Sequence, residues 1–160
     1  MIKFLGLLLI FFCFAMGGYT IAKREKERIH RAEGMLVLIR SIRQGAAFLR
    51  MPLGEIYRSF SCDALKKGEF LSTLCQKGLK EAYLSHKDEF GYDGFTEGRF
   101  LTFAESVGKL PLEEQLHACD MVSELLEEKL REAKASFPTK KKLYVTLGMT
   151  LGIGAVILLL

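Results

Sequence analysis

The chain has 160 residues, of which 49% are hydrophobic and 26% are charged, and its formal net charge is +4. This is enough chain for one domain with one modest core. Acidic residues offset the basic ones over most of the middle, and aromatic and basic residues do not alternate, which disfavours a nucleic-acid-binding surface. The four cysteines are isolated in the sequence, so we expect small core residues and neither disulfides nor metal ligands.

Both ends of the chain are apolar. Phe4 to Ala22 contains no charged residue, and Leu143 to Leu160 contains none either. A bilayer core takes about 17 to 25 apolar helical residues. We therefore expect an all-α protein in which residues 1–22 and 143–160 are transmembrane helices and residues 23–142 form a helical bundle between them.

Basic residues flank both apolar runs on the side of the middle domain. They are Lys23, Arg24, Lys26, Arg28 and Arg31 after the first run, and Lys140, Lys141 and Lys142 before the second. Lys and Arg near membrane spans stay in the cytoplasm, which predicts a cytoplasmic middle domain in a cell membrane, with both termini across it. A cleaved signal peptide is disfavoured because the basic cluster follows the apolar run.

The first half of the middle domain is predicted to hold three helices. An apolar stripe of helical period continues the first span to Leu49, and Pro52 ends that helix. A short helix follows from Leu53 to Phe60, with a turn or cap at residues 61–63. A further helix from about Gly68 to Tyr83 has these apolar positions: Phe70, Leu71, Leu74, Cys75, Leu79 and Tyr83.

The second half is predicted to hold two helices. Phe90 to Phe95 is a loop whose three aromatic residues we expect to tuck against the core. Thr96 is the expected N-cap of a helix that ends before Gly108. Pro111 lies near the start of the last soluble helix, which runs to about Ser136. Pro138 is expected to break the chain's helix before the second span. The apolar stripe of that last helix is Leu112, Leu116, Cys119, Val122, Leu126 and Leu130.

No constellation of residues supports catalysis. The three histidines are scattered, and none has the spacing of a zinc site. A phosphate-binding GxxxxGK[ST] loop and a GxSxG elbow are both absent from the sequence. We expect no catalytic residues, no metal site and no cofactor, and we expect that the protein is not an enzyme.

Gly148 and Gly152 form a GxxxG pair in the second apolar run. Small residues four positions apart let two membrane helices approach closely. The glycines of the first run, Gly6, Gly17 and Gly18, are candidate partners, and the contact can lie within one chain or between copies in a homo-oligomer.

Several short segments, in a fixed order between two spans, resemble the stage III sporulation protein AB family of endospore-forming Firmicutes. They are Ile2–Gly6, Pro52–Glu55, Phe103–Gly108 and Glu114–Leu116. Gly108 and Gln115 match the two ends of a family motif. Pro111 stands where the family has an Asp, which would cap the following helix. Proline starts the same helix by fixing φ.

The resemblance implies a function that the residues alone do not. The family belongs to the mother-cell proteins that build a channel-like secretion complex between mother cell and forespore. Its domain is similar to the type II secretion F proteins, so it would act as a membrane platform that meets a secretion-type ATPase and other channel proteins. Glu124, Glu127 and Glu128, on the charged face of the last helix, are the candidate ATPase contacts. The alternative is a membrane-anchored regulator that binds a cytoplasmic partner through residues 90–95.

Overall fold

The computed structural model describes the backbone of residues 2–49, 51–66 and 68–159, and the side chains of these residues apart from 2–8, 10, 11, 15, 49 and 159. All elements in these ranges are helices, and no strand occurs in them, as predicted. The elements are α1 (Ile2–Gln44), a π-helical turn η1 (Gly45–Leu49), α2 (Leu53–Ser59), α3 (Asp63–Lys66), α4 (Phe70–Lys77), α5 (Leu79–Phe90), α6 (Gly94–Ser106) and α7 (Leu112–Leu159).

The chain divides into two compact units. Unit 1 joins the residues up to Glu27 with those from Glu132 onward, and unit 2 is residues 28–131. The helices α1 and α7 each contribute to both units, and α2 to α6 belong to unit 2 alone. The predicted division at residues 23 and 143 concerns the membrane boundary and stays a prediction.

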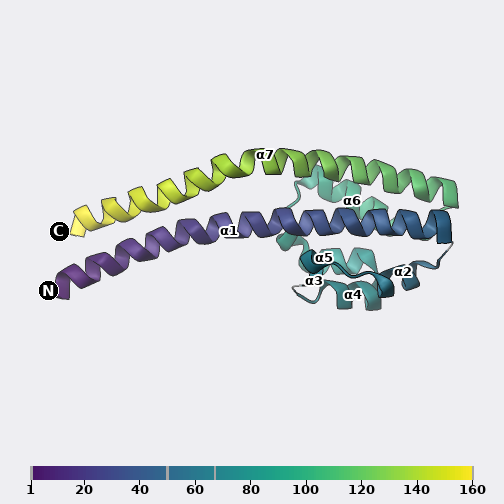
Figure 1. Cartoon of the computed structure of the whole chain (residues 1–160), viewed down its shortest axis with the longest axis horizontal. Coiled ribbons are helices and arrows are strands. Elements are labelled where there is room, and N and C mark those ends of the chain that lie inside the picture. Colours follow the sequence, from purple (N-terminus) through teal and green to yellow (C-terminus); the bar gives the residue numbers. More distant parts are fainter. Residues whose placement is uncertain (1, 50, 67, 160) are drawn as a thin grey trace. The chain divides into compact units, whose positions relative to one another are not determined.

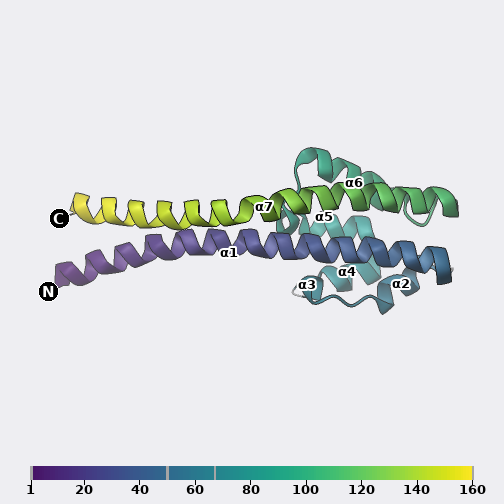
Figure 2. The same cartoon turned by 45° about the horizontal axis from the view of Figure 1, so that its top comes forward.

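Unit 1 is a pair of antiparallel helices. The first part of α1 and the last part of α7 lie side by side, and their outer ends lie at the same end of the pair (Figures 1 and 2). As predicted, α1 continues without interruption from the first apolar run into the middle domain.

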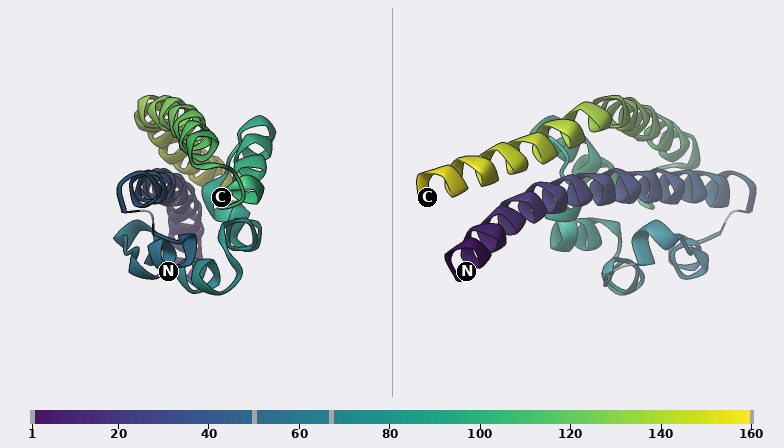
Figure 3. Two further views of the ribbon diagram at one scale, coloured as in Figure 1. Left: turned by 90° about the vertical axis from the view of Figure 1, so that its right-hand side faces the viewer. Right: turned by 60° about the vertical axis from the view of Figure 1, so that its left-hand side comes forward.

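Unit 2 is a bundle built around α1. Its residues 28–44 lie between α7 on one side and the short helices α2 to α5 on the other (Figures 1 and 2). Viewed end-on, the short helices wrap one side of the α1–α7 pair in this unit (Figure 3). The stripe predicted for α1 is the centre of the core, because Met35, Leu38, Ile39 and Ile42 are all fully buried.

Aromatic rings form the part of this core that lies among α4, α5 and α6. The Tyr83 ring lies 4.6 Å from that of Phe100, and stacks on Tyr92 with centroids 5.9 Å apart. Phe90 contacts both Tyr83 and Phe70. Edge-to-face and offset ring pairs contribute about 0.5–1.5 kcal/mol each beyond the area they bury. This cluster ties α4, α5 and α6 together.

The predicted helix over residues 68–83 is wrong, because Gly78 divides it. Gly78 has φ 87° and ψ 178°, so α4 ends before it and α5 starts after it. A side chain with a Cβ rarely adopts that φ. Cys75, predicted to be buried, is exposed on α4. Leu112, the first residue of α7, is exposed as well.

The start of α6 also differs from the prediction. Asp93, not Thr96, is the N-cap, and its carboxylate accepts a 2.7 Å hydrogen bond from the Thr96 backbone N–H. Thr96 is buried inside the first turn instead. Of the three loop aromatics, Phe90 and Tyr92 pack in the core cluster, whereas Phe95 is 63% exposed beneath the Arg99 guanidinium.

Pro138 does not break the last helix, and this expectation is also wrong. α7 is one helix from Leu112 to Leu159 with Pro138 inside it. A proline removes one backbone hydrogen bond and crowds the preceding turn, which kinks a helix without having to end it. The last soluble helix and the second apolar run are therefore parts of a single element.

The turn from α6 to α7 follows the prediction. The chain leaves α6 at Val107, and Gly108 takes a left-handed φ of 83°. A Cβ there would also lie 3.1 Å from the Leu53 side chain. Pro111 directly precedes α7, where its carbonyl accepts from the Gln115 backbone N–H at 2.9 Å.

Candidate functional site

The two helices of unit 1 meet backbone to backbone at Gly18 and Gly148. A Cβ built on Gly18 would lie 2.5 Å from the Tyr144 carbonyl oxygen, and one on Gly148 would lie 2.8 Å from the Phe14 carbonyl oxygen. Both glycines are buried. Any larger residue must therefore push the helices apart. Small residues allow the same close approach of backbones in pairs of membrane helices.

The other glycines of the apolar runs differ in how much space surrounds them. Gly152, the second residue of the predicted pair, is buried as well. Gly17 and Gly154 have open space where a Cβ would point. Gly6 lies outside the described side chains. The structure thus places the predicted packing glycine Gly148 against Gly18 of the same chain.

A salt bridge sets the same antiparallel register further along the pair. Lys140 Nζ lies 3.2 Å from Glu25 Oε1. Two contacts give the register of the pair, because Gly18 lies opposite residues 144–148 and Glu25 lies opposite Lys140. In this register, Lys23 is level with Lys142. The first apolar run therefore ends, and the second begins, at the same level of the helix pair.

One helix of the described residues qualifies as a membrane span. It is α7, which holds an 18-residue stretch that is long and apolar enough, and only 11% of that stretch is buried. A core helix of a soluble protein would be mostly buried. Eight of the 19 side chains of the first apolar run lie outside the described set, and the N-terminal span stays a prediction.

Two of the predicted membrane-flanking basic residues bind within the bundle. Arg31 forms an ion pair with Glu89, and Arg28 Nη2 donates to the Asp88 carbonyl at 3.3 Å. Asp88 and Glu89 lie in the last turn of α5, where unpaired carbonyls favour cations. Arg28 and Arg31 thus hold the end of α5 against α1. The other basic residues of this set, Lys23, Arg24, Lys26, Lys140, Lys141 and Lys142, belong to unit 1 and are exposed.

Two ion pairs join α1 to α7 inside unit 2. Arg43 makes a two-pronged contact with Asp120, with Nε to Oδ1 at 2.5 Å and Nη2 to Oδ2 at 3.1 Å. This hydrogen bonding lowers the pKa of the Asp120 carboxyl and raises that of Arg43. One turn along α1, Arg40 Nη2 lies 2.6 Å from Glu127 Oε1.

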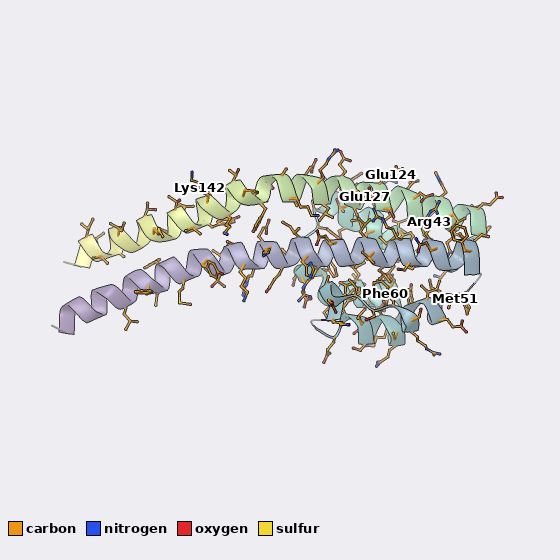
Figure 4. The ribbon with its side chains drawn as sticks, viewed as in Figure 1. Arg43, Met51, Phe60, Glu124, Glu127 and Lys142 are labelled. Carbon is orange, nitrogen blue, oxygen red and sulfur yellow. The ribbon has the colours of Figure 1, made fainter. Side chains whose placement is uncertain are left out.

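The three candidate partner-binding glutamates are not equivalent. All three lie exposed on α7, where Figure 4 labels Glu124 and Glu127. Glu127 is the partner of Arg40. No ion pair links Glu124 or Glu128 to any part of the chain that the structure describes. Glu124 and Glu128, one helical turn apart, therefore form the acidic pair that remains open to a partner.

The family-motif residues Gly108 and Gln115 contact each other. The Gly108 backbone N–H donates to Gln115 Oε1 at 3.2 Å. Gln115 lies in the first turns of α7, so its side chain closes the turn that brings α7 back along α1. Their role in this structure is to fix the α6–α7 connection.

The described part of the bundle holds a pocket and a buried cysteine thiol. A pocket of about 320 Å³ between α1 and α2 is lined by residues without ionisable side chains, among them Met51 and Phe60 (Figure 4). Cys119 is fully buried, and burial raises the pKa of its thiol to about 11, which keeps it protonated. Among the described residues, no group of three or more His, Cys, Asp or Glu side chains is placed to hold a metal ion.

The resemblance in sequence is confirmed by comparison with family models. The model of stage III sporulation protein AB matches residues 3–160. The chain belongs to this family. Membership indicates a role in sporulation. No curated protein and no solved structure matches the chain.

The sequence alone did not predict the ion pairs that join α1 to α5 and α7 in unit 2. Arg40, Arg43 and Arg31 stand at the edges of the apolar stripe of α1, which marks them as residues that border a packed neighbour. Their partners lie 58 to 87 residues away. Helical periodicity shows which side of a helix faces the core. It does not show which residues of a neighbouring helix lie opposite.

Replacement of Gly148 by leucine should separate the helix pair of unit 1. A disulfide between Cys residues introduced at Glu25 and Lys140, with the native cysteines changed to alanine, reports the register. We expect this disulfide to form within one chain and to be lost in G148L, as measured by gel mobility and mass spectrometry. The matched control G154L should keep it, because Gly154 has open space around it. Disulfides only between chains would contradict the intrachain packing.

The Arg43–Asp120 pair should make stability depend on acid pH. Because the folded pKa of Asp120 is lowered, the stabilisation is complete above the unfolded value of about 3.9 and is lost as the pH falls through the folded pKa. We expect ¹³C NMR of the full chain in micelles to show Asp120 titrating below that value. In R43Q its pKa should rise toward about 3.9, whereas Asp63, which pairs with Lys66, should be unaffected. An Asp120 titration unchanged by R43Q would contradict the assignment.

Proposed function

We propose that this protein is a non-catalytic membrane platform in a channel-like secretion complex between mother cell and forespore, and that it couples a cytoplasmic secretion-type ATPase to the assembly. The observation that carries the proposal is that α1 and α7 are continuous helices shared by unit 1 and the bundle. A platform has to transmit force between a membrane anchor and a partner-binding domain. Two unbroken helices supply such a connection with no flexible linker.

The proposal includes two membrane spans. At a rise of 1.5 Å per residue, Phe4 to Ala22 covers about 28 Å and Leu143 to Leu160 about 27 Å, close to the thickness of a bilayer core. Their matched register, given by the Gly18–Gly148 contact and the Glu25–Lys140 salt bridge, supports a hairpin whose two helices cross the same layer.

The proposal also assigns sides to the membrane. The clustered basic residues of unit 1 follow one apolar run and precede the other, so they lie toward residues 28–131 along the chain, whereas Lys3 is the one basic residue of the sequence beyond an apolar run. By the positive-inside rule, this charge distribution supports a bundle in the cytoplasm of the mother cell, with both termini across the membrane. A cytoplasmic bundle is accessible to an ATPase.

Within the bundle, the acidic pair Glu124 and Glu128 is the proposed contact with the ATPase or another channel protein. Both side chains are exposed on α7. Exposed charges steer association and set orientation more than they add affinity. The likeness to the type II secretion F proteins, which the family resemblance implies, adds the expectation of an ATPase partner. Likeness at the level of fold does not by itself fix a function.

The alternative is a regulator that binds a cytoplasmic partner through residues 90–95. Two aromatic side chains of this segment are taken up by the core, since Phe90 is buried and Tyr92 packs on Tyr83, while Gly91, Asp93 and Gly94 are exposed. Only Phe95 of the three aromatics is exposed. We therefore favour the platform.

Charge reversal in E124K/E128K should weaken assembly without unfolding the bundle, because neither side chain has a role in the core. We expect loss of at least about tenfold in the ATPase recovered with the tagged protein from sporulating cells, equivalent to about 1.4 kcal/mol. Circular dichroism should show unchanged helix content. Glu127 is left in place because its reversal would break the pair with Arg40.

The matched control is E113K/E114K, which makes the same charge change at two exposed glutamates in the first turn of the same helix. This control should recover the ATPase as well as the wild type does. Full recovery with a folded E124K/E128K would contradict the proposed contact. Recovery of only a regulator or a metabolic enzyme with the wild type would favour the alternative function.

A further inference from the structure

Six of the basic residues of unit 1 lie near one level of the helix pair. We define this basic collar as Lys23, Arg24 and Lys26 on α1 with Lys140, Lys141 and Lys142 on α7. The antiparallel register places Lys23 level with Lys142, and the Glu25–Lys140 salt bridge crosses the pair within the collar. Two segments 115 residues apart in sequence therefore present their cations at the same height.

Most of the collar's charge is unneutralised. Lys140 pairs with Glu25, but no ion pair joins Lys23, Arg24, Lys26, Lys141 or Lys142 to any residue that the structure describes. All five side chains are exposed. With Glu25 and Glu27 as the acidic residues of the same band, six cations face two anions. This differs from Arg28 and Arg31, whose charges are used to hold α5.

Aromatic residues mark the level next to the collar. Tyr19 lies one turn from Lys23 toward the apolar end of α1 and is 60% exposed, and Tyr144 lies two residues beyond Lys142 on α7. Tyrosine favours the layer between headgroups and acyl chains. A cationic band with tyrosines about 3 to 6 Å deeper corresponds to the headgroup level of a bilayer.

We propose that the basic collar is a binding surface for anionic phospholipid headgroups and that it selects these lipids over zwitterionic ones in the shell around the helix pair. Several exposed cations at one level meet several phosphates at once, and clusters of four or more Lys or Arg next to a membrane span attract anionic lipid. The inference goes beyond the platform function but rests on its membrane spans. Free polyanions are not the proposed ligand, because the collar borders the apolar surface on which lipid tails would lie.

Spin-labelled lipids test this with the full chain reconstituted in phosphatidylcholine bilayers. We expect spin-labelled phosphatidylglycerol to associate with the protein at least about threefold more than spin-labelled phosphatidylcholine, since each nearby cation contributes up to about fivefold in attraction to an anionic surface. The ratio of bound phosphatidylglycerol to bound phosphatidylcholine should fall toward one in 1 M salt, where the screening length is about 3 Å.

Two matched variants locate the effect. K23Q/R24Q/K142Q should abolish most of the preference, while glutamine preserves helix propensity. The control R58Q/K77Q/K109Q removes the same number and kinds of charge from exposed sites of unit 2 and should keep it. An inserted protein with no preference, or a preference that survives in the collar variant, would overturn the collar and leave the platform function intact. A chain that carbonate extracts from the bilayer would overturn the membrane spans and the collar together.

Discussion

The structure depends on a constraint placed on two helices, α1 and α7, each of which has to pack in two different surroundings. In unit 2 their apolar stripes are buried among α2 to α6, where burial of apolar area supplies the driving force. In unit 1 they have only each other, and their contact is made by the backbones at Gly18 and Gly148. In the membrane hairpin that we propose, a bilayer gives no hydrophobic gain for helix association, so close packing would replace it.

This constraint explains features that otherwise look unrelated. Glycines that would weaken an isolated helix are placed where a side chain has no room, at Gly18 and Gly148 in unit 1 and at Gly34 in unit 2, where a Cβ would lie 2.9 Å from the Ala64 and Leu65 side chains. Charged residues of α1 pair across to α7 or α5, which fixes the rotation and register of helices whose apolar contacts alone allow sliding. Glu124 and Glu128 on α7 take no part in these ion pairs.

Helical periodicity was sufficient to predict the class of fold and most of the core. The stripe from Met35 to Ile42 and the stripe through Cys119, Val122 and Leu126 are both buried as predicted. The errors lie at single residues with unusual backbone chemistry. Gly78 divides a helix that the apolar pattern runs across, and Pro138 fails to end one, because a long helix can accommodate a proline by kinking.

The candidate site was less predictable than the fold. The GxxxG spacing identified Gly148 and Gly152, but only the structure assigns Gly18 as the partner and excludes Gly17. The charge pattern grouped Arg28 and Arg31 with the membrane-flanking residues, although both bind the end of α5. Such partners depend on which helices face each other, and a single sequence carries no record of distances between segments far apart in the chain.

Reporter fusions test most directly the sidedness of the membrane hairpin that we propose. Alkaline phosphatase is active only outside the cytoplasm, so it is joined to the chain after Arg31 and, separately, after Leu160. The account predicts an inactive fusion after Arg31 and an active fusion after Leu160. Active phosphatase after Arg31 would place the bundle outside the cytoplasm and would contradict the account.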